Sequence, residues 1–382
     1  METKTFIKEY LIKMREIQKY LLEYFENEET QENDFEKLIQ FLDEQKIREN
    51  QHELKSFLHL ISKIATHHRP RCYFNKIEQI LKNFTNEIQK YYSNCELFNI
   101  FRSNKRLLLF LFEEKMLLPS QALKSIITND QYKARFYPQY FYTEFKQFYT
   151  DDSIRLEDSE MENYEEKRKI GENDTFVCKL IREDLLEEFI TFVQRSNLPL
   201  NTTVNSIFET NTFLCKNQPT LIEYAAFFGS SQIFKYLYMS GAELKSSLWL
   251  YSIHGRCPEI VYLLGEYKCQ KSSQSDFDCL VESLRCHHFE ITDYIQTNLF
   301  ESHGEKDVTL FSKCLKFYNF VYLTDKFGNA LQILDNFCNK IFEKKSSQEF
   351  DIFCVFCKYD YYSIVEFLLK TRDLNLKSTI IK

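Results

Sequence analysis

Cysteine and histidine side chains form two clusters in this chain that could hold a metal ion or carry redox chemistry. Cys286, His287 and His288 are consecutive, and Cys354 and Cys357 form a C-x-x-C pair. A zinc site needs about four ligands in a tetrahedron, and a redox C-x-x-C lies in a βαβ setting that the flanking sequence does not predict. We therefore predict no metal and no cofactor, with zinc at the first cluster as the alternative.

Structural roles explain these side chains more simply. His287 falls at a turn between two expected helices, and histidine is enriched in the left-handed conformation that such a turn requires. Cys357 takes the place of a small core residue, where cysteine behaves as a buried apolar side chain. Farther upstream, Arg69 and Arg71 flank Pro70 in a pattern typical of a helix end, and anion binding is the alternative there.

Motifs for enzyme catalysis are missing from the sequence. It contains no G-x-x-x-x-G-K-[ST], no G-x-G-x-x-G, no H-E-x-x-H and no G-x-S-x-G. Only 7 glycines are present, so a glycine-rich phosphate-binding loop is not expected. We predict that the protein is not an enzyme and has no catalytic residues.

Composition places the chain among folded soluble proteins. The 382 residues are 44% hydrophobic and 27% charged, and the formal net charge of -7 argues against nucleic acid as a partner. The longest apolar run, residues 107–112, is far shorter than the roughly 20 residues of a membrane helix. No secretory leader opens the sequence, so we expect a cytoplasmic protein whose 12 cysteines are thiols, with no membrane partner.

Helical periodicity dominates the first third of the chain. Apolar residues recur at three- and four-residue steps from Phe6 to about Ile127. The stretch from Asp151 to Asp174 is crowded with acidic residues and has few apolar ones, which is typical of a solvated linker. We therefore expect a helical N-terminal domain at residues 1–150, an acidic linker at 151–174, for which a docking peptide is the alternative, and a repeat domain at 175–382.

Residues 220–244 carry the strongest pattern in the sequence, which predicts helix, tight turn and helix. The Ala225-Ala226 pair lets two helices approach closely, and Gly229 can take positive φ in the turn. The apolar face of the second helix consists of Ile233, Phe234 and Leu237. One such unit cannot bury this face alone, so neighbouring units are expected.

The same register recurs elsewhere in the second half of the chain. Copies lie at residues 184–189, 248–264, 280–295 and 353–369, and a weak copy whose register cannot be fixed lies at 315–323. We predict an all-α protein in which the helical N-terminal domain precedes a solenoid of about five or six helix–turn–helix repeats. The last unit is expected to be the polar cap of the array, and a truncated array is the alternative.

These repeats resemble divergent ankyrin repeats, strongly over residues 217–247 and by pattern over the rest of 175–382. The whole chain is similar to a protist-type family of ankyrin proteins with a helical leader, through stretches such as Asn104-Lys105-Arg106-Leu107 and Tyr137-Pro138-Gln139-Tyr140. The usual Thr-Pro-Leu-His start appears here as Thr220-Leu221-Ile222-Glu223, so looser loops are expected. The resemblance implies a fold and leaves the biochemical role open.

Protein binding is the function we predict, because ankyrin stacks present side chains at fixed spacing on a rigid concave face. The alternative is an architectural protein that self-associates through its terminal repeat. By register, the exposed first-helix positions that would contact another protein are Glu223, Phe227, Phe228, Leu250, His254, Val281 and Arg285. For Phe227 and Phe228, packing against the adjacent unit is the alternative.

Overall fold

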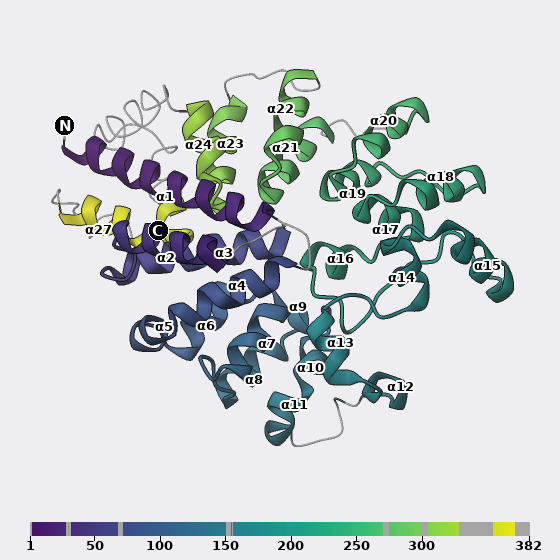
Figure 1. Ribbon diagram of the computed structural model, residues 1–382, viewed down its shortest axis with the longest axis horizontal. Coiled ribbons are helices and arrows are strands. Elements are labelled where there is room, and N and C mark those ends of the chain that lie inside the picture. The colour runs from purple at the N-terminus through teal and green to yellow at the C-terminus, as the bar shows by residue number, and fades with distance from the viewer. Residues whose placement is uncertain are drawn as a thin grey trace, which may run out of the picture. The chain divides into compact units, whose positions relative to one another are not determined.

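A computed structural model describes residues 2–27, 32–67, 72–149, 154, 156–269, 275–298, 305–327 and 354–370. Their secondary structure is helical, apart from one isolated bridge between Thr203 and Thr220, which confirms the predicted all-α class (Figure 1). Among the described helices, none combines the length and the apolar character that crossing a membrane requires. The structure does not describe the residues around Pro70, for which anion binding is the alternative. It also does not describe the last residues of the chain, where a polar cap is expected.

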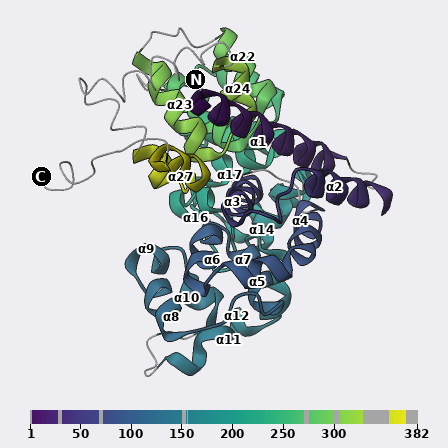
Figure 2. The same ribbon diagram turned by 90° about the vertical axis from the view of Figure 1, so that its left-hand side faces the viewer.

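Two compact units make up the chain, and the first combines its two ends. Met1–Lys63 group with Glu301–Lys382, and Ile64–Phe300 form the second unit. The first unit contains α1 (Glu2–Glu26), α2 (Glu32–Glu44), most of α3 (Gln51–His67), α23 (Glu305–Phe317), α24 (Phe320–Phe327) and α27 (Tyr362–Lys370). Helix α1 packs against α24 along its length, and both views of the ribbon show the two side by side (Figures 1 and 2).

Buried polar contacts join the distant segments of the first unit. Gln18 of α1 is buried, and its side-chain oxygen accepts hydrogen bonds from the backbone N–H groups of Phe320 (2.6 Å) and Val321 (2.9 Å). These groups begin α24 and would otherwise lack a partner within their helix. The ring of Phe6 stacks on that of Phe367 at 4.2 Å, so α1 also contacts α27.

His59 makes the other link within this unit. Its Nε2 lies 3.0 Å from the Asp360 carboxylate, which Lys55 also approaches at 3.6 Å. Burial lowers the pKa of His59 despite the opposing effect of Asp360, and the nearby charges of Lys63 and Lys55 act in the same direction as burial. The pKa of Asp360 is lowered as well, because its hydrogen bond and charge interaction with His59 outweigh partial burial.

The second unit begins with short helices around a buried centre. These are α4 (Cys72–Asn83), α5 (Thr85–Tyr91), α6 (Asn94–Phe101), α7 (Lys105–Glu113), α8 (Gln121–Ile127), α9 (Asp130–Lys133), α10 (Tyr137–Tyr140), α11 (Tyr142–Phe145), the 3₁₀ helix η1 (Lys146–Phe148), α12 (Asp158–Met161) and α13 (Tyr164–Ile170). Helix α7 is the centre, since its first eight residues are all buried.

Helical pairs follow along the rest of this unit. They are α14 (Phe176–Arg182) with α15 (Leu186–Ser196), α17 (Leu221–Phe228) with α18 (Ser231–Met239), α19 (Leu248–Gly255) with α20 (Pro258–Glu266), and α21 (Ser275–Cys286) with α22 (Phe289–Asn298). Consecutive first helices contact one another, as do the second helices α15, α18 and α20. In Figure 1 the pairs succeed one another from the right-hand side, where α14 and α15 lie, to the top, where α21 and α22 lie. Helix α16 (Thr212–Asn217) lies between the first two of these pairs.

The turn inside each pair contains one residue in the left-handed backbone conformation, at the same position in every turn. Gly229 takes φ +70° and His287 takes φ +57°, as the sequence analysis predicted for both. The equivalent turns have Asp184 (φ 50°), Arg256 (φ 47°), Tyr318 between α23 and α24 (φ 56°), and Asp360 between helical residues 354–358 and α27 (φ 61°). The weak repeat near residue 318 therefore has the same turn as the others.

The packing face of α18 follows the predicted register. Ile233, Phe234 and Leu237 are each 0% exposed. Between the first two pairs, the Asp184 carboxylate accepts hydrogen bonds from the backbone N–H groups of Gln232 (3.1 Å) and Ile233 (3.0 Å) at the start of α18. One expectation is wrong: Cys357 is exposed, so it does not fill a core position.

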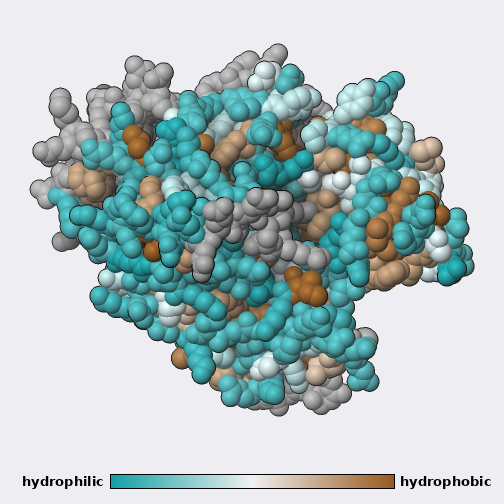
Figure 3. All heavy atoms as spheres, in the orientation of Figure 1, coloured by the Kyte–Doolittle hydropathy of each residue, from teal (hydrophilic) through white to brown (hydrophobic). Residues whose placement is uncertain are grey.

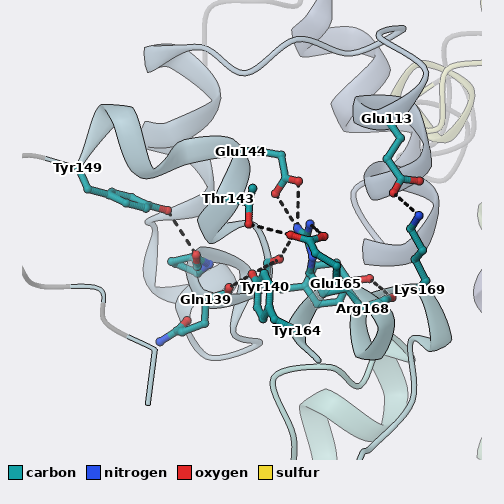
Figure 4. Close-up of polar contacts among 11 residues, drawn as sticks. Glu113, Gln139, Tyr140, Thr143, Glu144, Tyr149, Tyr164, Glu165, Arg168 and Lys169 are labelled. Atoms are coloured by element: carbon teal, nitrogen blue, oxygen red, sulfur yellow. Dashed lines mark hydrogen bonds and ion pairs between the residues drawn. The ribbon is translucent and has the colours of Figure 1, made fainter. Parts of the chain in front are cut away.

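The compact units differ from the expected domains at residues 1–150, 151–174 and 175–382. The expected linker is folded where the structure describes it, because α13 places Arg168 in a buried polar network (Figure 4). The Arg168 guanidinium pairs with Glu144 at 2.7 Å and also with Glu165, while the hydroxyl of Tyr164 donates to the carbonyl of Tyr140 at 2.8 Å. Ion pairing therefore compensates for the few apolar residues of this segment.

Candidate functional site

The predicted contact residues are less exposed than their register suggested. Glu223, Phe227, His254 and Val281 are buried, which contradicts the expected exposure of these four side chains. The other three, Phe228, Leu250 and Arg285, are half-buried. The structure thus agrees with the alternative for Phe227, in which its ring packs against the adjacent unit.

Phe213 of α16 explains much of this burial. Its ring stacks on that of Phe227 at 6.0 Å and lies 4.8 Å from the ring of Tyr251 and 4.5 Å from that of His254. Residues 197–220, which separate α15 from α17, form an insertion between the first two helical pairs. The insertion places an aromatic side chain against the first helices and covers part of the face that they form.

Hydrogen bonds from the middle of the insertion hold it in place. Lys105 is buried and donates to the carbonyl of Ile207 at 2.9 Å, and burial lowers its pKa. The hydroxyl of Thr212 donates to the carbonyl of Ser103 at 2.7 Å. The side-chain oxygen of Asn211 accepts from the backbone N–H of Phe213 at 3.0 Å and so caps α16.

Glu223 has a capping role that its sequence context could have revealed. Thr220 and Glu223 form a reciprocal capping box at the start of α17, a pattern read directly from threonine followed three residues later by glutamate. The other Glu223 oxygen accepts from the hydroxyl of Ser247 at 2.5 Å, next to α19. The pair therefore fixes the start of α17 and connects this helical pair to the next one.

A cavity of about 430 Å³ opens beside the covered face, within the second unit. Its walls come from the ends of three first helices, from the turn after α13, from the loop before α16, and from α3 and α4. Residues on its walls include Phe74, Gly171, Arg182, Glu209, Phe227, Phe228, His254 and Arg256. This volume lies in the range of about 300–1,000 Å³ that ligand pockets occupy.

Arg182 is one of the charged residues that line this cavity, and no sequence motif marks it. Its guanidinium contacts the Glu172 carboxylate at 2.9 Å and donates to the hydroxyl of Tyr224 at 2.9 Å, and it lies 6.0 Å from the ring of Phe228. Burial acts to lower the pKa of Arg182, but the adjacent Tyr224 and Glu172 outweigh it, so the pKa is raised. The cavity therefore combines a fixed cation with aromatic walls.

His254 on the cavity wall also belongs to a chain of reactive side chains. Its Nε2 lies 2.8 Å from a Glu282 oxygen, and the Cys286 sulphur lies 3.4 Å from its Nδ1. Hydrogen bonding to His254 and the charges of His254 and Arg285 lower the pKa of Glu282, although burial alone would raise it. Cys286 is thus grouped with His254 and Glu282, and not with His287 and His288 as the sequence suggested.

This order of thiol, imidazole and carboxylate resembles a nucleophile with its base and orienting acid. The Cys286 thiol is 0% exposed, however, and Cys286 does not line the cavity. A substrate in the cavity therefore has no access to the sulphur, and the arrangement does not support nucleophilic catalysis.

The face seen in Figure 3 is mostly hydrophilic, with small hydrophobic groups over the α14 to α18 region.

Comparison of the chain with protein families, curated proteins and solved structures finds no match.

Proposed function

We propose that this chain is a divergent ankyrin-like repeat protein that binds another protein and catalyses no reaction. The binding surface is the cavity at the ends of α14, α17 and α19, together with the half-buried side chains around it. The cavity is the observation on which this proposal depends, because it combines aromatic walls with a fixed arginine. Such concave sites accept the large anchor side chains on which protein interfaces depend.

The repeated helical pairs support the ankyrin-like part of the proposal. Each first helix contacts the first helix of the next pair, and each turn contains one residue in the left-handed backbone conformation. Packing of each pair on the next fixes the spacing of the cavity walls before any partner arrives, so little conformational entropy is lost on binding.

Phe228 is the side chain best suited to test the proposal. It lines the cavity and is half-buried, whereas its neighbour Phe227 is 1% exposed and serves the core. Tyr262 of α20 is 65% exposed and does not line the cavity, which makes it a matched aromatic control.

Affinity capture with the full-length chain tests binding. Proteins captured by the wild type are compared with those captured by the Phe228→Asp and Tyr262→Asp variants, after circular dichroism has shown that both variants are folded. We expect a specific protein to be lost with Phe228→Asp and retained with Tyr262→Asp. Identical captured proteins for all three chains would contradict the assignment of the cavity.

A further inference from the structure

We propose that His254, Glu282 and Cys286 form a binding site for Zn²⁺. The three side chains are buried, and one ligand atom from each lies within 4.8 Å of the others. Imidazole nitrogen, carboxylate oxygen and thiolate sulphur are the three protein ligands that Zn²⁺ uses. A water molecule would complete the tetrahedron of such a three-ligand site.

The spacing of the ligand atoms is close to what a tetrahedral zinc ion needs. Bond lengths of about 2.0–2.3 Å place a nitrogen and an oxygen about 3.3 Å apart, and a sulphur and a nitrogen about 3.6 Å apart. The Cys286 sulphur lies 3.7 Å from His254 Nε2, and the Glu282 oxygen lies 2.8 Å from the same atom. The same sulphur lies 3.4 Å from His254 Nδ1, so it faces the side of the imidazole ring. Entry of the metal thus requires the carboxylate and the imidazole to separate by about half an ångström and the imidazole to turn until Nε2 points between the other two ligand atoms.

Helix geometry and neighbouring side chains hold the ligands in place. Glu282 and Cys286 are four residues apart on α21, so they share one face of the helix, and His254 faces them from α19. Arg285 contacts the second oxygen of Glu282 at 2.8 Å. The rings of Phe213 and Phe227 lie 4.5 and 4.8 Å from that of His254. Contacts of this kind orient metal ligands and strengthen binding.

A divalent ion would supply the positive charge that a buried thiolate requires. The guanidinium of Arg285 already pairs with the Glu282 carboxylate, whereas the Cys286 thiolate would form only with the ion beside it. The thiol proton of Cys286 passes to solvent when the metal binds, as in other thiolate sites. This site goes beyond the proposed binding function and does not depend on it, since Glu282 and Cys286 do not line the cavity.

Titration of the metal-free full-length chain with Co²⁺ tests the site, because a cobalt–thiolate bond gives a charge-transfer absorption band. The control is Cys279→Ser, which alters another buried cysteine of the same helix that lies outside the group. We expect the band at one equivalent in the wild type and in Cys279→Ser, and no band in Cys286→Ser. Displacement of Co²⁺ by Zn²⁺ should abolish the band.

Two further variants make the result independent of any single substitution. Glu282→Gln should keep the cobalt–thiolate band while weakening Zn²⁺ affinity at least tenfold, and Arg285→Gln should weaken it about tenfold. Absence of the band in the folded wild type, or its presence in Cys286→Ser, would overturn the proposal. If Cys286→Ser does not fold, His254→Gln takes its place: we expect no cobalt–thiolate band in this variant, and its presence would overturn the proposal.

Discussion

Gly255→Ala should destabilise the protein, although alanine is normally preferred to glycine in a helix. A Cβ at residue 255 would lie 2.3 Å from the carbonyl oxygen of Ala226 and 3.1 Å from the backbone nitrogen of Gly229. Unstrained carbon–oxygen contacts are about 3.3 Å or longer, so α17 and α19 would have to separate by roughly 1 Å. Overpacking of this kind costs about 1–3 kcal/mol, against a helix-propensity gain of at most about 1 kcal/mol. We expect a net loss of about 1–2 kcal/mol.

Gly265→Ala is the matched control, because it also lies at the end of a helix. A Cβ there meets no atom within 4 Å, so only the propensity gain of about 0.5–1 kcal/mol remains. Urea unfolding can be followed by the fluorescence of Trp249, the single tryptophan, which is buried in α19. The two substitutions should shift the midpoint in opposite directions. Stabilisation by both would refute the close approach of α17 and α19.

Three further perturbations test the packing, the buried ion pair and the buried histidine. Leu237→Ala should cost about 2–5 kcal/mol of unfolding free energy, since the side chain is 0% exposed; a loss below about 0.5 kcal/mol would contradict the repeat register. Glu144→Ala should cost about 3–5 kcal/mol, because it removes the more deeply buried of the two carboxylates that pair with the buried charge of Arg168, and the double variant with Arg168→Met should cost less in urea unfolding. His59 has a lowered pKa, so the unfolded chain binds more protons below about pH 6.5, and stability should fall as the pH drops from 7 to 5. In His59→Gln this part of the pH dependence should disappear, and an unchanged profile would exclude His59 as its origin.

Local patterns in the sequence predicted the helical pairs well. Gly229 and His287 were assigned to left-handed turns, and Leu237 to a buried face, because small residues and apolar spacing act within one unit. The ankyrin identity of these pairs and their role in binding stay predictions. Nothing in the spacing distinguishes this family from other stacks of helical pairs.

Contacts between distant parts of the sequence could not be predicted in the same way. Periodicity shows which face of α1 is apolar, but not that Gln18 meets the start of α24 about 300 residues later. Similarly, the repeat register predicted an exposed Phe227, because no local sequence pattern indicates that Phe213 of the insertion covers it. The grouping of His254 with Glu282 depends on contact between neighbouring first helices, which also lies outside any local motif.

Site-specific photocrosslinking tests most directly whether the cavity binds a protein. A photoreactive phenylalanine is placed at residue 228 or at residue 262 of the full-length chain, and each chain is irradiated in an extract of the cells that produce it. We predict a discrete crosslinked protein from position 228 that position 262 does not give. The same products from both positions, or none from position 228, would contradict the binding function proposed for this cavity.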